Sequence, residues 1–264
     1  MDLQLKGKTA FVSGSTQGIG YAIAKQLLEE GASVIINGRN PQRVKESVAK
    51  LKAAVPAGSI SGVAADFSKA SEVNDLLPQI EHVDILINNA GIFAPIPFAE
   101  ITDQQWMEMF EVNVLSGVRL SRHIFPKMLE RNWGRIIFIS SESAVQIPEE
   151  MIHYGMSKTA QLSVSRGLAE LTKGTGVTVN SILPGPTQSE GVTEFVKQFA
   201  EVKKLSFEEA EKSFFETARP SSLLRRFATV EEVANMVSFI ASPLSSATNG
   251  AAVRVDGGVV RSIL

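Results

Sequence analysis

The chain lacks the residues that most often form cross-links and metal sites. None of its 264 residues is cysteine, so disulfides and thiolate metal sites are excluded. Its three histidines are scattered at positions 82, 123 and 153 and form no cluster with the spacing of metal ligands. We therefore expect no metal ion in the functional site.

Membrane segments and a strong surface charge are also missing. No apolar run reaches the roughly 18 residues that a membrane helix needs. The first residues, MDLQLKGKTAFVSG, lack the charged and then apolar pattern of a signal peptide. The formal net charge of −2 gives no reason to expect binding to a polyanion. The sequence thus predicts a soluble cytoplasmic protein with no nucleic-acid partner and no membrane partner.

The chain does show a regular alternation of short apolar runs and longer amphipathic stretches. Most runs are nearly continuous in apolar residues, which is typical of parallel strands buried on both faces. The runs are Thr9–Ser13, Ser33–Asn37, Ser59–Ala65, Asp84–Asn88, Arg135–Ser140, Val177–Ile182 and Ala251–Val255. The stretches between them include Ile19–Glu30, Pro41–Ala53, Asp103–Arg131 and Met151–Lys173. This alternation predicts one α/β domain over residues 1–264, a doubly wound Rossmann-type fold with a seven-stranded parallel sheet and helices on both faces.

One region interrupts the alternation. Residues 184–224 begin with Pro-Gly-Pro and contain two charged amphipathic stretches. An insertion near the ends of strands is a suitable place for a segment that covers an active site. We expect the residues from about 186 to 224 to form a substrate lid.

The first apolar run leads into a glycine-rich turn. Residues 13–20 read SGSTQGIG and open directly into a helical pattern. Glycine lets the backbone approach a pyrophosphate closely, and the N–H groups at a helix N-terminus favour bound phosphate. The spacing is G-x3-G-x-G rather than the commoner G-x-G-x-x-G. We expect cofactor contacts from Gly14, Ser15, Thr16, Gly18, Ile19 and Gly20.

The end of the second run indicates which dinucleotide binds. An acidic residue about 20 residues after the turn holds the ribose hydroxyl of NAD in sites of this type. Gly38 stands where that acid would be, and Arg39 follows it. Because an arginine fork suits a 2′-phosphate, we expect NADP, with NAD as the less favoured cofactor.

Tyr154 and Lys158 form a candidate proton-transfer pair. Their spacing of four places both side chains on one face of a helix, one turn apart. A free tyrosine has a pKa of about 10, and an adjacent ammonium group favours the phenolate and lowers that pKa. The pair is therefore suited to moving a proton to or from a substrate oxygen.

Ser141 stands just past the apolar run of residues 136–139, at the predicted end of a strand. In doubly wound folds the ligands bind at such strand ends. A serine hydroxyl there can donate a hydrogen bond to a substrate oxygen and stabilise developing charge. Ser140 and Ser143 are the alternatives for this role.

Taken together, these residues resemble the short-chain dehydrogenase/reductase family over essentially the whole chain. The motifs that carry the resemblance follow one another in the order and spacing of that family. They are the turn Gly14–Gly20, Asn88-Asn89-Ala90-Gly91, Asn113, Ser141, Tyr154, Lys158, Pro184-Gly185 and Val255-Asp256-Gly257-Gly258.

The resemblance implies further roles for individual residues. Asn113 would hold a water molecule in a proton relay through Lys158, and Lys158 would also bind the nicotinamide ribose. Further cofactor contacts are implied for Asp66, Phe67, Asn89, Ala90, Gly91, Tyr154, Pro184, Gly185 and Thr187. Ser189 stands where the family often has a threonine, so Thr187 and Ser189 are both candidates for the carboxamide contact. The family also implies a homotetramer or homodimer built through the long helices over residues 103–131 and 151–173.

The predicted enzyme is an NADP(H)-dependent oxidoreductase that transfers a hydride between nicotinamide and the carbonyl or secondary alcohol of a small molecule. Its catalytic residues would be Tyr154, Lys158, Ser141 and Asn113. The substrate stays open between the types used by 3-oxoacyl-(acyl carrier protein) reductases and by sugar or polyol dehydrogenases. A nucleotide-binding redox sensor is the non-enzymatic alternative, but a sensor needs none of these four residues. Glu142 either points away from the site or reads a polar or cationic substrate.

Overall fold

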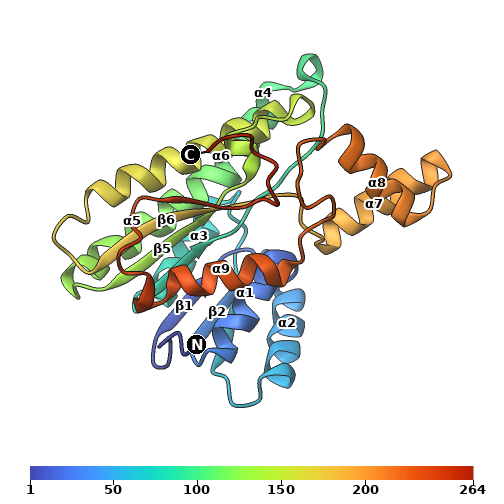
Figure 1. The fold of residues 1–264 in the computed structure, drawn as a ribbon. Coiled ribbons are helices and arrows are strands. Elements are labelled where there is room, and N and C mark those ends of the chain that lie inside the picture. Colours follow the sequence, from blue (N-terminus) through green and yellow to red (C-terminus); the bar gives the residue numbers. More distant parts are fainter. Residues whose placement is uncertain (264) are drawn as a thin grey trace.

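A seven-stranded parallel sheet forms the centre of the molecule (Figure 1). The computed structural model describes residues 1–263, except for the side chains at positions 195, 198, 199 and 202. The strand order is β3-β2-β1-β4-β5-β6-β7, and every pairing is parallel. The strands are β1 (Thr9–Val12), β2 (Ser33–Gly38), β3 (Ile60–Ala64), β4 (Ile85–Asn88), β5 (Gly134–Ile139), β6 (Val177–Pro184) and β7 (Ala252–Val255). The predicted fold class and all seven predicted strands are confirmed.

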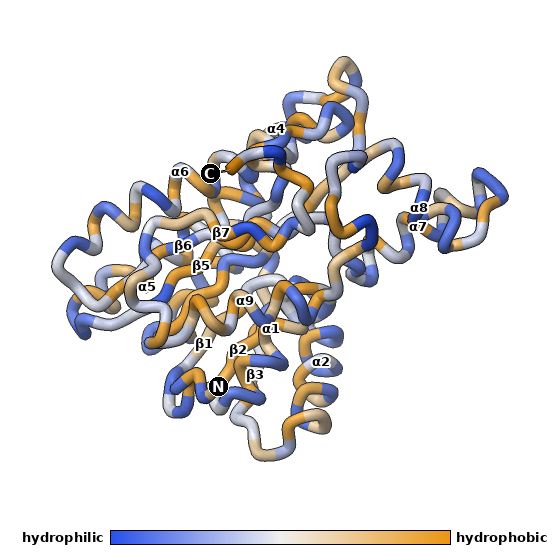
Figure 2. Tube along the Cα trace, viewed as in Figure 1, coloured by the Kyte–Doolittle hydropathy of each residue, from blue (hydrophilic) through white to orange (hydrophobic). Residues whose placement is uncertain are grey.

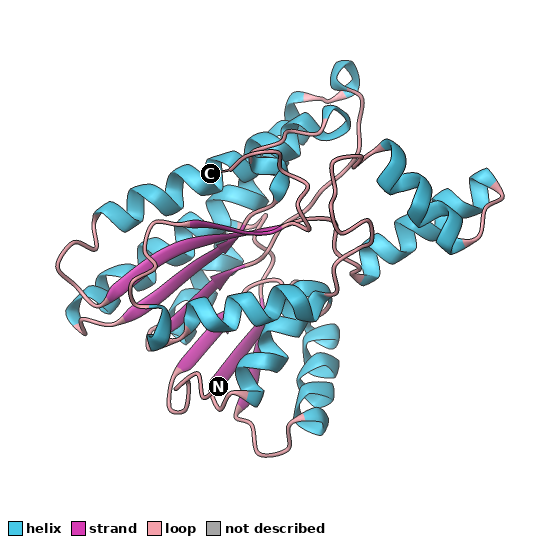
Figure 3. Ribbon diagram, in the orientation of Figure 1, coloured by secondary structure: helices cyan, strands magenta, loops and turns pink. Residues whose placement is uncertain are grey.

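Helices cover both faces of the sheet (Figure 3). One face packs against α1 (Gly18–Glu29), α2 (Pro41–Ala54) and α9 (Val230–Ala241). The other face packs against α3 (Ala70–Leu76), α5 (Ser116–Glu130) and α6 (Ile152–Glu170). The observed helices therefore agree within a few residues with the predicted helical stretches at 19–30, 41–53 and 151–173.

The alternation of side chains along each strand supplies both layers of the core. In β1, Ala10 and Val12 belong to the cluster under α1 and α9, whereas Phe11 belongs to the cluster under α5. All three are fully buried, and burying a side chain as large as Phe11 contributes about 1.5–3 kcal/mol to stability. Figure 2 shows the central strands as mainly hydrophobic segments. The continuous apolar pattern of the inner strands follows from this burial on two sides.

The two outer strands are less buried than the apolar pattern predicts. Most residues of β3 and β7 are half-buried or exposed. Each of these strands lies at an edge of the sheet and has a neighbour on one side only. The prediction of burial on both faces therefore holds for the inner strands and is wrong for the edges.

The long stretch predicted as one helix over residues 103–131 is three segments. The helix α4 (Asp103–Phe110) passes through a π-helical segment (Glu111–Leu115) into α5. A π segment widens the helix locally and is frequent at functional sites. Here it contains Asn113, whose side chain is buried.

Two helices after β6 project away from the sheet as a pair, α7 (Glu190–Lys203) and α8 (Phe207–Thr217) (Figure 1). They have a small apolar cluster of their own, which includes Val196, Ala210, Phe215 and Phe227. The pair therefore holds together by its own packing and stands over the carboxyl ends of the strands. Within the described residues, no helix is both long enough and apolar enough to cross a membrane.

Candidate active site

Two adjoining cavities lie at the carboxyl ends of the strands, where the chain order reverses between β1 and β4. Ligands of doubly wound folds bind at this switch point. The larger cavity, of about 620 Å³, runs along the glycine-rich turn. The smaller one, of about 290 Å³, lies over the ends of β5 and β6. Their shared lining residues are Ile19, Asn89, Gly91, Ile92, Phe93 and Ser189.

The glycine-rich turn is shaped by contacts that leave no room for side chains. Gly14 has a positive φ of 59°, and a Cβ there would lie 2.9 Å from the Cα of Ala90. A Cβ on Gly20 would lie 2.4 Å from Nδ2 of Asn89. That same Nδ2 donates to the carbonyl oxygens of Ser13 and Gly14 at 3.0 and 2.8 Å. Asn89 therefore braces the turn, and Gly18, Ile19 and Gly20 at the start of α1 line the larger cavity.

The larger cavity gathers most of the predicted cofactor residues. Its lining includes Gly14, Thr16, Gly18, Ile19, Gly20, Arg39, Asp66, Phe67, Asn89, Ala90 and Gly91. Ser15 is the exception, because its buried hydroxyl donates to the carbonyl oxygen of Val12 at 2.6 Å and accepts from the N–H of Asn37. The side chain of Ser15 thus ties β1 to β2 rather than lining the cavity.

The end of β2 favours a cationic rather than an acidic group. A Cβ on Gly38 would lie 2.6 Å from Cγ2 of Thr16, so the methyl group of Thr16 fills the space of an acidic side chain. Arg39 and Arg43 both line the cavity beside it. Burial raises the pKa of Asp66. Hydrogen bonds from Ser68 and the positive charges of Lys69 and Arg39 lower it by more, so that the pKa lies below its ordinary value.

The smaller cavity gathers the predicted proton-transfer residues. Ser141, Tyr154 and Lys158 all line it, together with Pro184, Gly185 and Thr187. Lys158 Nζ lies 5.6 Å from the centre of the Tyr154 ring and donates to the carbonyl oxygen of Ile139 at 2.9 Å. The helical spacing therefore brings the ammonium group and the phenol together as predicted.

Burial acts on both members of this pair. It lowers the pKa of Lys158 to about 8, because a low-dielectric surrounding disfavours the ammonium charge. Burial also raises the pKa of Tyr154, and the nearby carboxylate of Glu142 raises it further, while Ser141 and Arg219 lower it by less. The protein by itself thus holds Tyr154 as the neutral phenol, the form that donates a proton.

Asn113 lies behind the cavity instead of lining it. Its side chain exchanges hydrogen bonds with the backbone of Ile92 and donates to Ser157 Oγ at 2.9 Å. The main-chain carbonyl oxygen of Asn113 accepts a hydrogen bond from Nε2 of Gln161. Oε1 of the same glutamine accepts one from Lys158 Nζ at 3.4 Å. Asn113 and Lys158 are therefore connected through Gln161, a buried glutamine one turn of α6 beyond Lys158.

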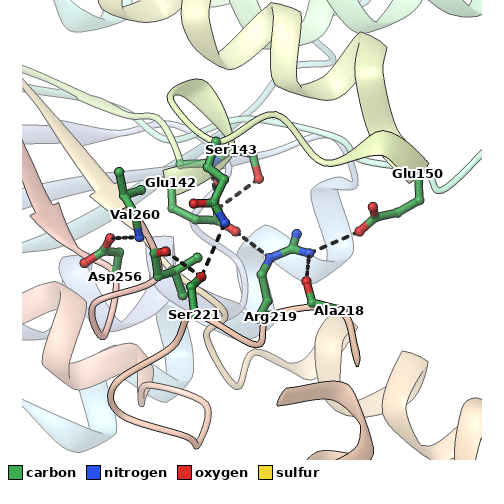
Figure 4. Close-up of polar contacts among 12 residues, drawn as sticks. Glu142, Ser143, Glu150, Ala218, Arg219, Ser221, Asp256 and Val260 are labelled. Carbon is green, nitrogen blue, oxygen red and sulfur yellow. Dashed lines mark hydrogen bonds and ion pairs between the residues drawn. The ribbon is translucent and has the colours of Figure 1, made fainter. Parts of the chain in front are cut away.

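Glu142 points into the site and is held on both carboxylate oxygens. Oε2 accepts from Ser141 Oγ at 2.5 Å, and from the N–H and hydroxyl of Ser143 at 2.6 and 2.9 Å. Oε1 accepts from Nε of Arg219 at 2.9 Å (Figure 4). Of the two alternatives left open by the sequence, the one in which Glu142 points away is therefore excluded.

Thr187 and Ser189 both line the smaller cavity but have different partners. Thr187 Oγ1 donates to the carbonyl oxygen of Gly185 at 2.9 Å. Ser189 Oγ accepts from the N–H of Val192 and caps the N-terminus of α7. Each hydroxyl thus has one partner within the chain, and Thr187 and Ser189 both stay candidates for the carboxamide contact.

Several residues of the site, or in contact with it, were missed from the sequence. Arg43 could have been found because it follows Arg39 by one turn at the start of a predicted helix. Gln161 had a weak signal, a polar residue on the same helix face as Lys158. Arg219 had none, because it follows α8 in an irregular segment and reaches Glu142 only through the fold. No cluster of three or more histidine, aspartate or glutamate side chains suited to a metal ion occurs within the described residues.

Comparison with known proteins finds relatives among oxidoreductases. The family model for short chain dehydrogenase matches residues 8–199. Two uncharacterised oxidoreductases of Bacillus subtilis (strain 168), YvrD and YvaG, are each 48% identical over 100% of both chains. Among solved structures, L-sorbose reductase from Gluconobacter frateurii, complexed with NADPH and L-sorbose, superimposes with a TM-score of 0.94 at 30% identity over 100% of both chains.

The chain belongs to the short-chain dehydrogenase family. The predicted family, fold class and oxidoreductase class are thereby confirmed. The enzyme acts on carbonyl or alcohol groups with a nicotinamide dinucleotide, NAD or NADP, as its cofactor.

Proposed function

We propose that the protein is an NADP(H)-dependent oxidoreductase of a small carbonyl or secondary alcohol, with Tyr154 as the residue that transfers the proton. The proposal depends on one observation. Tyr154, Ser141 and Lys158 line the smaller cavity, which adjoins the larger cavity along the glycine-rich turn. A nicotinamide held between the two cavities would supply or accept the hydride, while the protein's own residues orient the substrate and move the proton.

The larger cavity fits a dinucleotide in shape and in chemistry. Close backbone contacts at Gly14 and Gly20 keep the turn free of side chains, as a pyrophosphate requires. Arg39 would pair with a 2′-phosphate, and Asp66 and Phe67 would lie by the adenine. Pro184, Gly185 and Thr187 would flank the nicotinamide. The similarity to a solved reductase complexed with NADPH supports NADP over NAD.

The residues of the smaller cavity divide the proton chemistry among them. In carbonyl reduction, the Tyr154 hydroxyl donates its proton to the forming alkoxide oxygen. Ser141 Oγ stabilises that oxygen, and the Lys158 ammonium group stabilises the phenolate that remains. In alcohol oxidation the same groups act in reverse. Asn113 would return protons to Lys158 through water, with Gln161 as a direct connection between the two.

Further proposals concern the parts around the site. The segment of residues 186–224, with α7 and α8, serves as a lid of the one domain over residues 1–264. Val192, Phe214 and Arg219 of this segment line the smaller cavity, which supports a role in covering the substrate. The enzyme works in the cytoplasm as a homotetramer.

The test is the variant Tyr154→Phe in an assay with a panel of carbonyl and alcohol substrates. Loss of the hydroxyl should lower turnover by roughly a thousandfold or more, because a positioned acid or base contributes that much. The dissociation constant of NADPH should stay within about twofold, since the ring remains. Turnover is followed by absorbance of the reduced nicotinamide.

Tyr21→Phe is the matched control, because it removes the same hydroxyl from the only other tyrosine in the chain. It should keep its activity. Persistent turnover in Tyr154→Phe would refute the mechanism. If the wild-type protein binds NADPH tightly but turns over no member of the panel, the result favours a nucleotide-binding sensor.

A further inference from the structure

Glu142 is a buried carboxylate that lies between a predicted catalytic residue and a residue of the lid segment. Its Oε2 accepts a hydrogen bond from the Ser141 hydroxyl. Its Oε1 accepts one from Nε of Arg219 (Figure 4). The side chains of Glu142 and Arg219 are only 5% and 9% exposed. An ion pair this deeply buried interacts strongly, because little water screens it.

Arg219 reaches this position from the lid segment, two residues after α8 ends. Its Nη1 donates to Glu150 Oε1 at 3.2 Å and to the carbonyl oxygen of Ala218 at 2.8 Å. Glu150 belongs to the turn before α6, the helix that carries Tyr154. The guanidinium group thus connects the lid segment to both sides of the catalytic cavity.

Without Arg219, Glu142 would oppose both of its catalytic neighbours. The Ser141 hydroxyl already donates to Glu142 Oε2 at 2.5 Å. An unpaired carboxylate would accept that hydrogen bond more strongly and keep the hydroxyl from a substrate oxygen. It would also disfavour a negative charge on Tyr154, which faces Lys158, Glu142 and Arg219 in this cavity. The cation of Arg219 offsets both effects.

We propose that Arg219 is a positioning residue of the active site, which compensates the charge of Glu142 and so weakens both its hydrogen bond from Ser141 and its opposition to a negative charge on Tyr154. The inference rests on the proposed function of Ser141 and Tyr154. Arg219 belongs to the lid segment, whereas Glu142 follows β5. The charge of Glu142 is therefore balanced only when the lid segment is packed against the site.

The kinetic test compares Arg219→Gln, Glu142→Gln and the double variant. Arg219→Gln leaves the carboxylate unpaired and should lower turnover by roughly ten- to hundredfold. The double variant removes both charges and should recover turnover to within about fivefold of wild type. NADPH affinity should stay within about twofold in all three proteins, since neither residue lines the larger cavity.

A different result would show that the ion pair between Arg219 and Glu142 has only a structural role. If the pair only holds the lid in place, the double variant will be at least as impaired as Arg219→Gln, and that result overturns the proposal. Arg226→Gln is the matched control, because it breaks an exposed ion pair with Glu232 close to the same segment. It should keep turnover within about twofold of wild type.

A second measurement needs neither substrate nor cofactor. In a Tyr21→Phe background, Tyr154 is the only tyrosine, so the ultraviolet absorbance of tyrosinate reports on it alone. Glu142→Gln should give more tyrosinate than the background protein at a given alkaline pH at which both remain folded by circular dichroism. Equal or lower absorbance overturns the proposal. Because catalysis is not involved, this outcome is separable from a failure of the proposed activity.

Discussion

Arg39 is the residue on which the choice of cofactor depends. It is exposed at the end of β2, beside a position that Thr16 keeps free of side chains. An arginine that pairs with a 2′-phosphate makes a charge-assisted contact that NADH cannot offer. Arg39→Ala should therefore weaken NADPH binding by roughly tenfold or more and leave NADH binding within about twofold.

Fluorescence titration with both nucleotides measures this difference. Arg122→Ala, which removes an exposed arginine from α5, is the control and should leave both affinities unchanged. Tighter binding of NADH than NADPH to the wild-type protein would contradict the role of Arg39. So would an unchanged preference in Arg39→Ala.

At the residue scale, local spacing predicted some of the site and could not predict the rest. Tyr154 and Lys158 share a helix face, and helical geometry alone brings them together. Glu142 and Arg219 are 77 residues apart in the chain and meet only because the lid segment returns over β5. No local pattern in the sequence encodes that contact, so Glu142 stayed ambiguous until its partner was seen.

At the scale of elements, the N-terminus of α1 already carries a bound carboxylate. Glu190 Oε2, at the start of α7, accepts from the N–H of Gly18 at 2.7 Å. This N–H is one of those expected to meet the cofactor's pyrophosphate, so the carboxylate competes with it and repels it. Glu190→Gln should tighten NADPH binding by roughly two- to tenfold, because it removes the charge and keeps the shape.

The binding is best measured by calorimetry at low ionic strength, where surface charges are least screened. Glu201→Gln, on the same helix α7, removes an equal charge and should leave NADPH affinity nearly unchanged. Weaker binding to Glu190→Gln would instead mean that Glu190 supports the cofactor site.

The helix that carries Asn113 shows why element boundaries were harder to predict than element types. The stretch over residues 103–131 keeps one amphipathic pattern, so the sequence predicts one helix there. A π segment adds a residue to one turn, and the residues on both sides of it are still helical. The insertion is stabilised by partners outside the helix, since the Asn113 side chain bonds Ile92 and Ser157.

At the scale of the whole molecule, the homotetramer is a prediction that a single chain does not test. We expect light scattering after size exclusion to give the mass of four chains at micromolar concentration. The long helices α5 and α6 would supply the interfaces, because apolar faces of helices exclude water on association. A constant mass of one chain at every concentration would contradict the prediction.

The sequence alone determined the class of fold, because continuous apolar runs that alternate with amphipathic stretches can be buried only in a covered parallel sheet. It also predicted Tyr154 and Lys158 as a pair, because their spacing along one helix brings both side chains to one cavity. The tertiary structure decided that Ser15 serves the sheet, that Gln161 connects Lys158 to Asn113, and that Arg219 meets Glu142. These contacts join residues from different elements, and only the packing of those elements brings them within hydrogen-bonding distance.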